Sequence, residues 1–472
     1  MPKQRLARAA ALLAALIETA MTPTISHAQS SAARVDPSIR YQTFAGWGTS
    51  LAWWAHVVGA YPEPARRDYI ERIFDAKTGL GLTVVRYNIG GGENPAYLAP
   101  NKQFLEPRAA VPGYEPAPGQ WDWSADAAQR WVLKAAIGEG ADHLEAFSNS
   151  PPYWMTVSGS VTGGQGGAAN LDPRYDQAFA DYLAQVVQHF HDDWGVDFQT
   201  VESVNEPISN WWKFGGHQEG CHVGRAQQSA LVAALGAALE ARHLGARVSS
   251  PDENAVGDSV KTVEAYAPDA LAALGQVNTH SYWATDAARA ALRDFAAAHG
   301  KRLWMSEYGD GDASGMTLSE RILSDMKVLR PSAWVYWQAV DGGGWGLLVR
   351  NLNDSSGTAY TINEKYWVFA NYTRFIRPGD VLIDVADDQT LAALDEKAHK
   401  LILVATNNTG SPAARAFDLS KFPALTKSAL AYQTSATQNL APLAPLPLTG
   451  KRLSATLPAK SVTTFVVGWG GW

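Results

Sequence analysis

Two glutamates of the sequence stand at the ends of short apolar runs. Glu206 follows Asn205 within TVESVNEPIS (200–209), and Glu307 follows the apolar residues of RLWMSEYG (302–309). A buried carboxylate is costly unless it is paired or used, so both positions need a physical reason. Two carboxyls that face each other across a cleft can hydrolyse a glycosidic bond, because one protonates the leaving oxygen while the other attacks the anomeric carbon or activates water.

The segments around these glutamates alternate between two patterns. Eight short apolar runs are predicted strands, at 43–50, 81–88, 143–150, 198–205, 246–253, 275–282, 302–309 and 332–339. The segments between them carry Ala, Leu and Val at helical spacing. Apolar strands separated by such helices predict a parallel sheet covered by helices. Eight repeats of this kind are typical of an α/β fold with a (β/α)8 TIM barrel.

Polar residues end six of these eight predicted strands. They are Arg86 and Asn88, Ser148 and Asn149, Asn205 and Glu206, His280 and Tyr282, Glu307 and Tyr308, and Trp337 and Gln338. In a parallel barrel the active site lies at the carboxyl ends of the strands. The alternative for either glutamate alone is a salt bridge at the barrel rim, with Arg86 as its partner. Six strand ends with the same property favour a catalytic cleft instead.

The first 28 residues have the pattern of a signal peptide. Lys3, Arg5 and Arg8 precede the short apolar run AAALLAALI, and SHA stands before Gln29 as a cleavage site between small residues. A first helix of the fold is the alternative, but a run of Thr, Pro and Ser follows where a helical period would continue. We therefore expect an exported protein, either secreted or periplasmic.

The rest of the chain is predicted to form three further parts. Residues 29–43 are polar and strand-like, and residues 44–375 make the catalytic barrel. Residues 376–472 contain short β-rich runs with Asn, Gly and Pro turns and no helical period, which is typical of an antiparallel β-sandwich. The strand within 29–43 is predicted to join that sandwich.

The composition limits the partners of the protein. The chain has 472 residues, of which 18% are charged, and a formal net charge of −7. This balance argues against a nucleic-acid partner, which needs clustered Lys and Arg. No segment reaches the ~18 to 20 apolar residues that span a bilayer. Cys221 is the single cysteine, so no intramolecular disulfide forms. We expect a monomer that binds neither nucleic acid nor membrane.

Longer motifs of the chain resemble those of glycoside hydrolase family 30, a retaining family. The matching motifs are GWGTS (46–50), VVRYNIGGG (84–92), SNSPPYWM (148–155), SVNEP (203–207), SEYG (306–309), KYWVFANYTRFIRPG (365–379) and LPAKSVTTFVV (457–467). They span nearly the whole mature chain in family order. The resemblance implies a (β/α)8 barrel with an attached side β-sandwich. It also implies that Glu206 is the acid/base and Glu307 the nucleophile.

The roles of the neighbouring residues follow as expectations. A partly apolar wall would keep Glu206 protonated, and Asn205 would bind the sugar 2-hydroxyl. Arg86 and Tyr308 would hold Glu307 ionised. The remaining substrate-binding candidates are strand-end residues and loop aromatics, namely Trp53, Trp54, Asn149, Tyr153, Trp154, Trp211, His280, Tyr282 and Trp337.

The substrate is predicted from the amino-acid sequences of the loops. GTSLAWWAHVVG, SNSPPYWMTVSGSVTGG and EPISNWWKFGGHQEGCH look most like the endo-β-1,6-galactanase branch of the family, which acts on arabinogalactan side chains. Glucosidase members usually carry GFGGA where this chain has GWGTS. A cleft rimmed by tryptophans suits a neutral polysaccharide, and the axial 4-hydroxyl of galactose leaves one broad apolar face for stacking. β-1,6-Glucanase, β-fucosidase and xylanase activities stay open, as does a catalytically silent carbohydrate-binding barrel.

No metal or cofactor is expected. DGDASGMTLSER (310–321) begins like a calcium loop, but Arg321 stands where the closing glutamate belongs. TLSE (317–320) fits a helix-capping box better. His217, Cys221 and His222 have no evident fourth zinc ligand. Lys213, His217, Glu219 and His222 are interpreted as solvated loop residues, with contact to sugar hydroxyls as the alternative.

Overall fold

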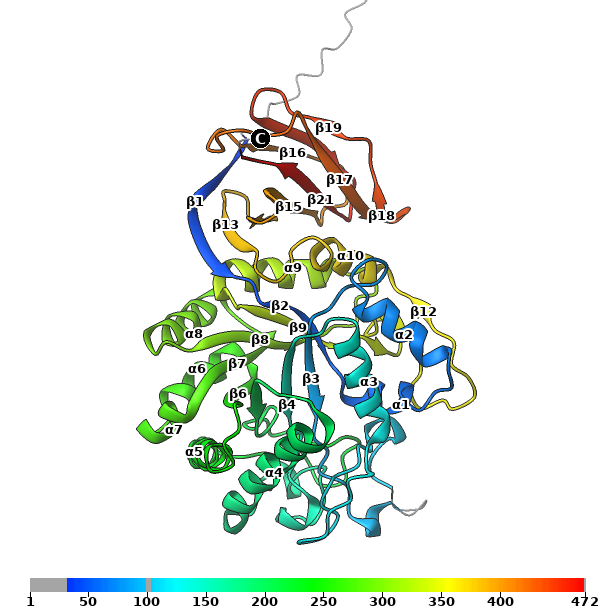
Figure 1. Ribbon diagram of the computed structural model, residues 1–472, viewed down its shortest axis with the longest axis vertical. Coiled ribbons are helices and arrows are strands. Elements are labelled where there is room, and N and C mark those ends of the chain that lie inside the picture. Colours follow the sequence, from blue (N-terminus) through cyan, green and yellow to red (C-terminus); the bar gives the residue numbers. More distant parts are fainter. Residues whose placement is uncertain (1–31, 99–102, 471–472) are drawn as a thin grey trace, which may run out of the picture. The chain divides into compact units, whose positions relative to one another are not determined.

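The computed structural model describes residues 32–98 and 103–470. Figure 1 shows a barrel of strands ringed by helices and a second sheet built mainly from the C-terminal strands. The predicted signal peptide, residues 1–28, lies outside the described residues, as do the first three residues of the segment 29–43. None of the described helices is long and apolar enough to cross a membrane.

Eight parallel strands of the described chain close into a barrel in the order β2 to β9. The closure is direct, because Gly46 of β2 pairs with Ala333 of β9. The predicted TIM barrel is therefore confirmed. The strands are β2 (Gly46–Ser50), β3 (Val84–Asn88), β4 (His143–Phe147), β5 (Thr200–Glu202), β6 (Arg247–Ala255), β7 (Leu274–Trp283), β8 (Arg302–Tyr308) and β9 (Ala333–Gln338).

Helices lie around this barrel, each with one apolar face turned inward. In α4 the buried residues Phe179, Leu183, Val186 and Phe190 recur at intervals of three and four, as one face of a helix requires. Gly195 then ends α4 in the left-handed conformation that favours glycine. The described helices are α1 (Ala52–Val58), α2 (Ala65–Phe74), α3 (Ala127–Gly138), α4 (Asp176–Trp194), α5 (Arg225–Ala241), α6 (Val256–Glu264), α7 (Pro268–Ala273), α8 (Asp286–Ala298), α9 (Met316–Ser324) and α10 (Glu364–Thr373).

Shorter elements fill the connections. Single 3-10 turns occur at Pro95–Tyr97, Pro107–Ala109, Tyr153–Met155, Gln165–Gly167 and Pro173–Tyr175, and a π turn at Asp325–Leu329 continues α9. Three two-residue strands, β10 (Val340–Asp341), β11 (Leu348–Val349) and β12 (Thr361–Ile362), form a small sheet after β9.

The start of α9 differs from the predicted capping box at Thr317 and Glu320. The helix begins at Met316, and the cap is Asp312, whose Oδ2 accepts the backbone N–H of Thr317 at 3.0 Å. Burial opposes the charge of Asp312, but this bond and those from Ser314 lower its pKa to about 2. Glu320 instead accepts a hydrogen bond from Asn408. The motif failed because an upstream aspartate competes for the same free amide groups.

The remaining strands form one curled sheet in the order β18-β17-β21-β15-β14-β13-β1-β16-β20, with β19 beside β17. β1 pairs antiparallel with β13 and parallel with β16, so it joins the two halves of the sheet. The sheet's strands are β1 (Ala33–Thr43), β13 (Val381–Val385), β14 (Thr390–Asp395), β15 (Lys400–Asn407), β16 (Ala413–Asp418), β17 (Ser428–Ser435), β18 (Gln438–Pro442), β19 (Leu446–Pro447), β20 (Arg452–Leu457) and β21 (Ser461–Gly468).

The two halves of the curled sheet enclose their own apolar core. Val35, Leu403, Phe417 and Phe465 are fully buried in it, and the rings of Phe417 and Phe465 lie 6.0 Å apart. The layer arrangement of a sandwich is thus reached by curling a single sheet. Helix α10 contacts strands β17, β18 and β21, and the hydroxyl of Thr464 donates to the carbonyl of Asn371 in α10 at 2.7 Å.

Candidate active site

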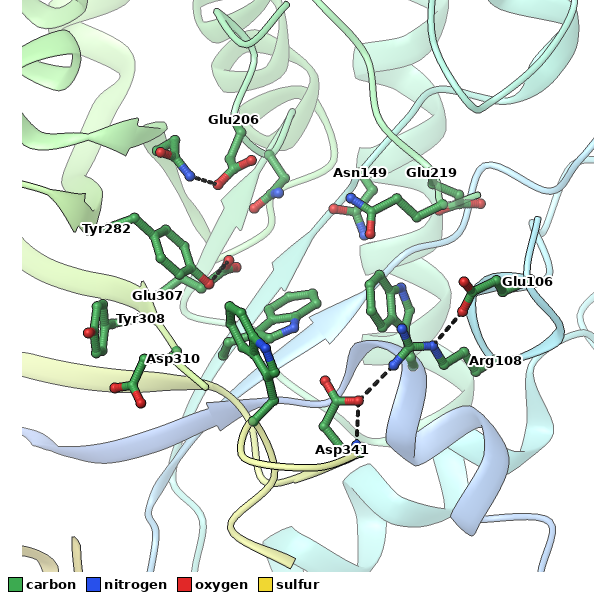
Figure 2. A pocket seen from close by; sticks show the side chains of 18 of the residues that line it. Glu106, Arg108, Asn149, Glu206, Glu219, Tyr282, Glu307, Tyr308, Asp310 and Asp341 are labelled. Atoms are coloured by element: carbon green, nitrogen blue, oxygen red, sulfur yellow. Dashed lines mark hydrogen bonds and ion pairs between the residues drawn. The ribbon is translucent and has the colours of Figure 1, made fainter. Parts of the chain in front are cut away.

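A cleft of about 970 Å³ opens at the carboxyl ends of the barrel strands (Figure 2). Its lining comes from β-strand ends and the loops that follow them. Nine of the residues predicted for the site line this cleft: Trp53, Asn149, Asn205, Glu206, Trp211, Tyr282, Glu307, Tyr308 and Trp337.

The carboxyls of Glu206 and Glu307 meet in this cleft. His280 lies between them, with Nδ1 3.0 Å from Oε1 of Glu206 and 3.5 Å from Oε1 of Glu307. One carboxyl oxygen from each glutamate lies within 4.8 Å of the other. Both side chains are nearly fully buried, so the pair is shielded from bulk water.

Glu307 is held on both of its oxygens. Tyr282 donates its hydroxyl to Oε1 at 3.0 Å, and Arg86 donates Nη1 to Oε2 at 3.2 Å. Burial raises the pKa of Glu307 to about 7, against the opposing charges of His280 and Arg86. The expectation that Tyr308 holds Glu307 is wrong, because the Tyr308 ring is adjacent to Arg321 and its side chain turns away from its neighbour along the strand.

A buried ion network supports the pair from below. Arg86 is fully buried on β3 and contacts Glu145 at 2.9 Å as well as Glu307 and Asp252. These three carboxyls raise the pKa of Arg86 despite its burial. Burial also opposes the charge of Asp252, but Arg86 and His280 lower the pKa of Asp252 to about 2.

His280 is a buried cation at the centre of this network. Its Nε2 lies 3.2 Å from Oδ1 of Asp252, and its Nδ1 faces both glutamates. Burial opposes protonation, but Glu307 and Asp252 raise the pKa of His280 to about 10. We therefore expect the ring to carry a positive charge at neutral pH, which suits its position among three carboxyls.

Glu206 has a strained backbone. Its φ is 48°, in the left-handed region that few residues other than glycine adopt. Three contacts hold it there: its N–H donates to the carbonyl of Asp252 at 3.0 Å, Nε1 of Trp212 donates to its carbonyl at 3.0 Å, and Nδ2 of Asn254 donates to its Oε1 at 2.6 Å. The carboxyl of Glu206 thus has polar partners, where the sequence predicted a partly apolar wall.

Several predicted substrate contacts do not reach the cleft. Trp54 is fully buried, and its Nε1 donates to the carbonyl of Ser50 at 2.8 Å. It follows Trp53 on α1, and consecutive helical residues point about 100° apart. Tyr153 and Trp154 lie in a 3-10 turn outside the lining, and Nε1 of Trp154 donates to the carbonyl of Glu115 at 3.0 Å.

Arg86 and His280 are also absent from the lining of the cleft. Both are fully buried beneath the two glutamates. Their predicted role as direct substrate contacts is wrong, because the carboxyls of Glu206 and Glu307 lie between them and the open space. They act on the glutamates.

Other lining residues were not predicted for the site, among them Glu106, Arg108, Asn254, Trp283, Asp310, Asp341 and Trp345, and Glu219 was predicted only as the alternative to a solvated loop residue. Asn254 is the last residue but one of β6 and directly follows the fifth predicted strand, 246–253, so the strand-end rule applied there would have found it. Glu219 is not a solvated loop residue: it is 2% exposed, its Oε1 accepts the N–H of Gly91 at 3.1 Å, and burial raises its pKa well above the ordinary value.

Two rim loops are fixed by a buried lysine. Nζ of Lys365 donates to Oδ1 of Asp310 at 2.7 Å and to the carbonyl of Gly344 at 2.8 Å. The ring of Trp345 lies so close to Gly309 that a Cβ there would meet it at 3.2 Å. The loops after β8 and β9 therefore present Asp310 and Trp345 to the cleft as one unit.

The lining is acidic. Among the described residues, the lining contains six carboxyl groups and one guanidinium, that of Arg108. The carboxyl groups belong to Glu106, Glu206, Glu219, Glu307, Asp310 and Asp341. Arg108 is already paired with Glu106 at 2.8 Å and Asp341 at 2.7 Å (Figure 2). Within the described chain, the lining therefore leaves no unpaired basic side chain to bind an anionic sugar, so the cleft suits an uncharged ligand.

The candidate zinc residues do not meet in one site. Burial raises the pKa of the Cys221 thiol to about 12, and Nδ1 of His222 lies 2.8 Å from the carbonyl of Gly167. Within the described residues, the group whose ligand atoms do lie close enough for a metal is Glu206, His280 and Glu307. In that group Nδ1 of His280 is hydrogen-bonded to Oε1 of Glu206 at 3.0 Å.

Comparisons with known proteins agree with this geometry. Residues 30–344 match the model of the O-glycosyl hydrolase family 30. The chain is 37% identical over 410 residues to an endo-β-1,6-galactanase of Hypocrea rufa, covering 82% of this chain and 83% of that protein.

Two further proteins are similar at lower identity. An exo-β-1,6-galactobiohydrolase of Bifidobacterium longum is 26% identical over 85% of this chain, which spans only 36% of that longer protein. The catalytic domain of a family 30 xylanase C from Talaromyces cellulolyticus has a TM-score of 0.71 at 22% identity, with 93% of this chain and 100% of that chain covered. The last similarity concerns the fold.

Proposed function

The chain belongs to O-glycosyl hydrolase family 30, and from this membership we propose that it cleaves β-1,6-galactosidic linkages with retention of configuration. That the protein is a glycosidase follows from the family itself. The linkage, the mechanism and the roles of the two glutamates are the proposal.

The separation of the two carboxyls is the observation that carries the mechanism. Retaining glycosidases hold their carboxyls about 5 to 5.5 Å apart, and inverting ones about 6.5 to 9.5 Å apart to admit a water molecule. Oxygens of Glu206 and Glu307 lie within 4.8 Å of each other. This spacing supports direct attack by one carboxylate on the sugar.

In the first step Oε of Glu307 attacks the anomeric carbon and the bond from that carbon to the linking oxygen breaks. Glu206 gives its proton to that oxygen, so the leaving sugar departs as an alcohol. In the second step Glu206 takes a proton from water while the water oxygen attacks the anomeric carbon and frees Glu307. Arg86 and Tyr282, which bind the oxygens of Glu307, stabilise the carboxylate as it leaves.

Two observations support a galactan as the substrate. The Hypocrea rufa relative, a β-1,6-galactanase by name, shares 37% of its residues over most of both chains. The acidic lining with its paired Arg108 suits a neutral polysaccharide and disfavours glucuronate side chains. Asn205 and Asn149 line the cleft, and we assign them to sugar hydroxyls.

Export and a monomeric state belong to the same proposal. The motif of residues 1–28 supports a signal peptide, and polysaccharide substrates are found outside the cell membrane. N-terminal sequencing of the protein from culture medium and periplasm tests the first, with Gln29 as the expected first residue, and its mass in solution tests the second.

The proposed activity is tested by product analysis on β-1,6-galactan, β-1,6-glucan and glucuronoxylan, with wild type beside Glu307→Gln. We expect short galacto-oligosaccharides from the first polymer only, a β-anomer as the first product by NMR, and loss of both with Glu307→Gln. Glu240→Gln, at an exposed position of α5, is the matched control.

The outcomes separate the parts of the proposal. Cleavage of glucan or xylan alone would overturn the galactan assignment and keep the mechanism. An α-anomer as the first product would overturn retention. Inactivity on all three polymers would contradict the proposed activity as a whole.

A further inference from the structure

The exposed tryptophans of the described chain all lie at one place. Trp211 is 47%, Trp283 73% and Trp345 43% exposed, and all three line the cleft. Tryptophan has a large apolar ring that is usually well buried in the free protein. Rings left open at a cleft are therefore suited to cover the apolar face of a ligand.

Trp283 belongs to the wall of the cleft that carries the acid/base candidate. It is the last residue of β7 and pairs with Ala255 of β6. The residue before Ala255 is Asn254, whose side chain donates to Oε1 of Glu206 at 2.6 Å. Trp283 is therefore linked through two neighbouring strands to the carboxyl of Glu206.

A second aromatic group of the cleft, Trp53, Trp337 and Trp345, comes from the opposite side of β8, whereas Trp211 and Trp212 lie in the loop after β5. Trp53 follows β2 and meets Trp337 of β9 edge to face, with ring centroids 5.3 Å apart. Trp345 lies in the loop after β9, against Gly309. Since the barrel order is β7-β8-β9-β2, Glu307 on β8 stands between Trp283 and this second group.

In the proposed reaction, different sugars bind on the two sides of the catalytic pair. The nucleophile bonds to the sugar that stays, and the acid/base protonates the oxygen of the sugar that leaves. A leaving sugar must therefore contact the wall that carries Glu206. That wall also holds Trp283.

We propose that Trp283 is the stacking platform for the sugar on the leaving side of the cleaved bond. The inference rests on the proposed function and deepens it. An enzyme with binding surface on the leaving side of the catalytic pair cleaves best where the polysaccharide continues past the linkage.

The test compares two substrates that differ only in the leaving side. One is β-1,6-galactotetraose, and the other is the β-fluoride of β-1,6-galactobiose, whose leaving fluoride makes no contact with a platform. We expect Trp283→Ala to lower the ratio of kcat/KM on the tetraose to kcat/KM on the fluoride on the order of tenfold. Trp283→Phe keeps a smaller ring, so its ratio falls less.

A second measurement reports the same contact on a longer substrate. On β-1,6-galactohexaose, Trp283→Ala is expected to lower every cleavage mode by a similar factor and to keep the wild-type product pattern, because each mode places a sugar directly on the leaving side of the bond. Leu430→Ala, which alters a 50% exposed residue of β17 far along the chain, is the control and should change neither readout.

Each outcome has one meaning. A wild type active on both substrates with an unchanged ratio in Trp283→Ala would overturn this inference alone. A wild type inactive on both galactosyl substrates would overturn the proposed function, and the inference with it.

Discussion

At the scale of single residues, the site is a set of charges that constrain one another. Glu206 and Glu307 share the ring of His280, which also contacts Asp252, and Asp252 is in turn paired with Arg86. A buried ion is stable only when its neighbours compensate its charge. Changing one member therefore alters the protonation of the others, and activity and pH dependence should move together.

Removal of the acid/base should spare substrates that need no proton. We expect Glu206→Ala to lose about 10² to 10⁴ in kcat on β-1,6-galactan, the usual contribution of general acid catalysis. On a 2,4-dinitrophenyl β-galactoside, whose leaving group needs no acid, the first step should persist. Added azide should then release the enzyme as the β-galactosyl azide, detected by NMR.

A glycosyl azide of α configuration from Glu206→Ala would contradict the assigned roles, because it would mean direct displacement on the substrate. Glu240→Ala is the control and should give no azide product.

The acid limb of the pH profile should report Glu307. Burial raises the pKa of Glu307 to about 7, and the nucleophile works only when ionised, so kcat/KM should fall as pH drops below about 7. His280 lowers the pKa of Glu307. His280→Gln should therefore move this limb to higher pH, which a kcat/KM profile from pH 4 to 9 would detect. A limb that stays in place, or moves to lower pH, would contradict the assigned coupling.

At the scale of elements, residues that are consecutive in a helix can have different roles, because their side chains point in different directions. Trp53 and Trp54 are consecutive on α1, yet one lines the cleft and the other is fully buried. The loops after β8 and β9 show the converse, since Lys365 of α10 joins Asp310 and Gly344 from separate segments. The role of a residue here depends more on where its side chain points than on its position in the sequence.

Trp53 and Trp54 therefore form a matched pair of substitutions. Trp54→Ala opens a cavity in the core and should cost about 3 to 5 kcal/mol in the free energy of unfolding. Trp53→Ala should cost clearly less and instead raise KM on galacto-oligosaccharides. Urea unfolding and steady-state kinetics on both variants check this. Equal losses of stability would contradict the assigned orientations.

At the scale of the whole molecule, the buried cation of the site links folding to pH. The pKa of His280 is raised from 6.5 to about 10 in the folded protein. Its contribution to stability is therefore fully present below about pH 6.5 and is lost as the pH rises toward 10. His280 therefore adds most to the free energy of unfolding in mildly acidic solution.

Between pH 7.5 and 9.5 the folded protein should hold about one proton more than the unfolded chain at this site. The free energy of unfolding should then fall by about 1.4 kcal/mol per pH unit from His280 alone. Urea unfolding of wild type and His280→Gln across this range measures the difference between the two slopes. Identical slopes would show that His280 is not a cation in the folded state.

The sequence by itself determined the barrel, its helices and the family, since these depend on local patterns. Apolar runs alternating with helical periods repeat eight times, and the strand-end position of Glu206 and Glu307 follows from the same pattern. The polar residues that end six of the eight predicted strands were visible in the sequence, because the period of a strand is regular.

Only the tertiary structure decided which side chains meet. The contacts of Asp252, Asn254 and Lys365 are with residues 48 or more positions away in the sequence. Trp54 is buried because its side chain points into the core, and Trp283 is exposed because it lies at the rim of the cleft. Contacts of this kind form when distant segments are brought together by closure of the barrel, and no local pattern encodes them. The residue types indicated the reaction, but the side chains that contact the two glutamates depended on the fold.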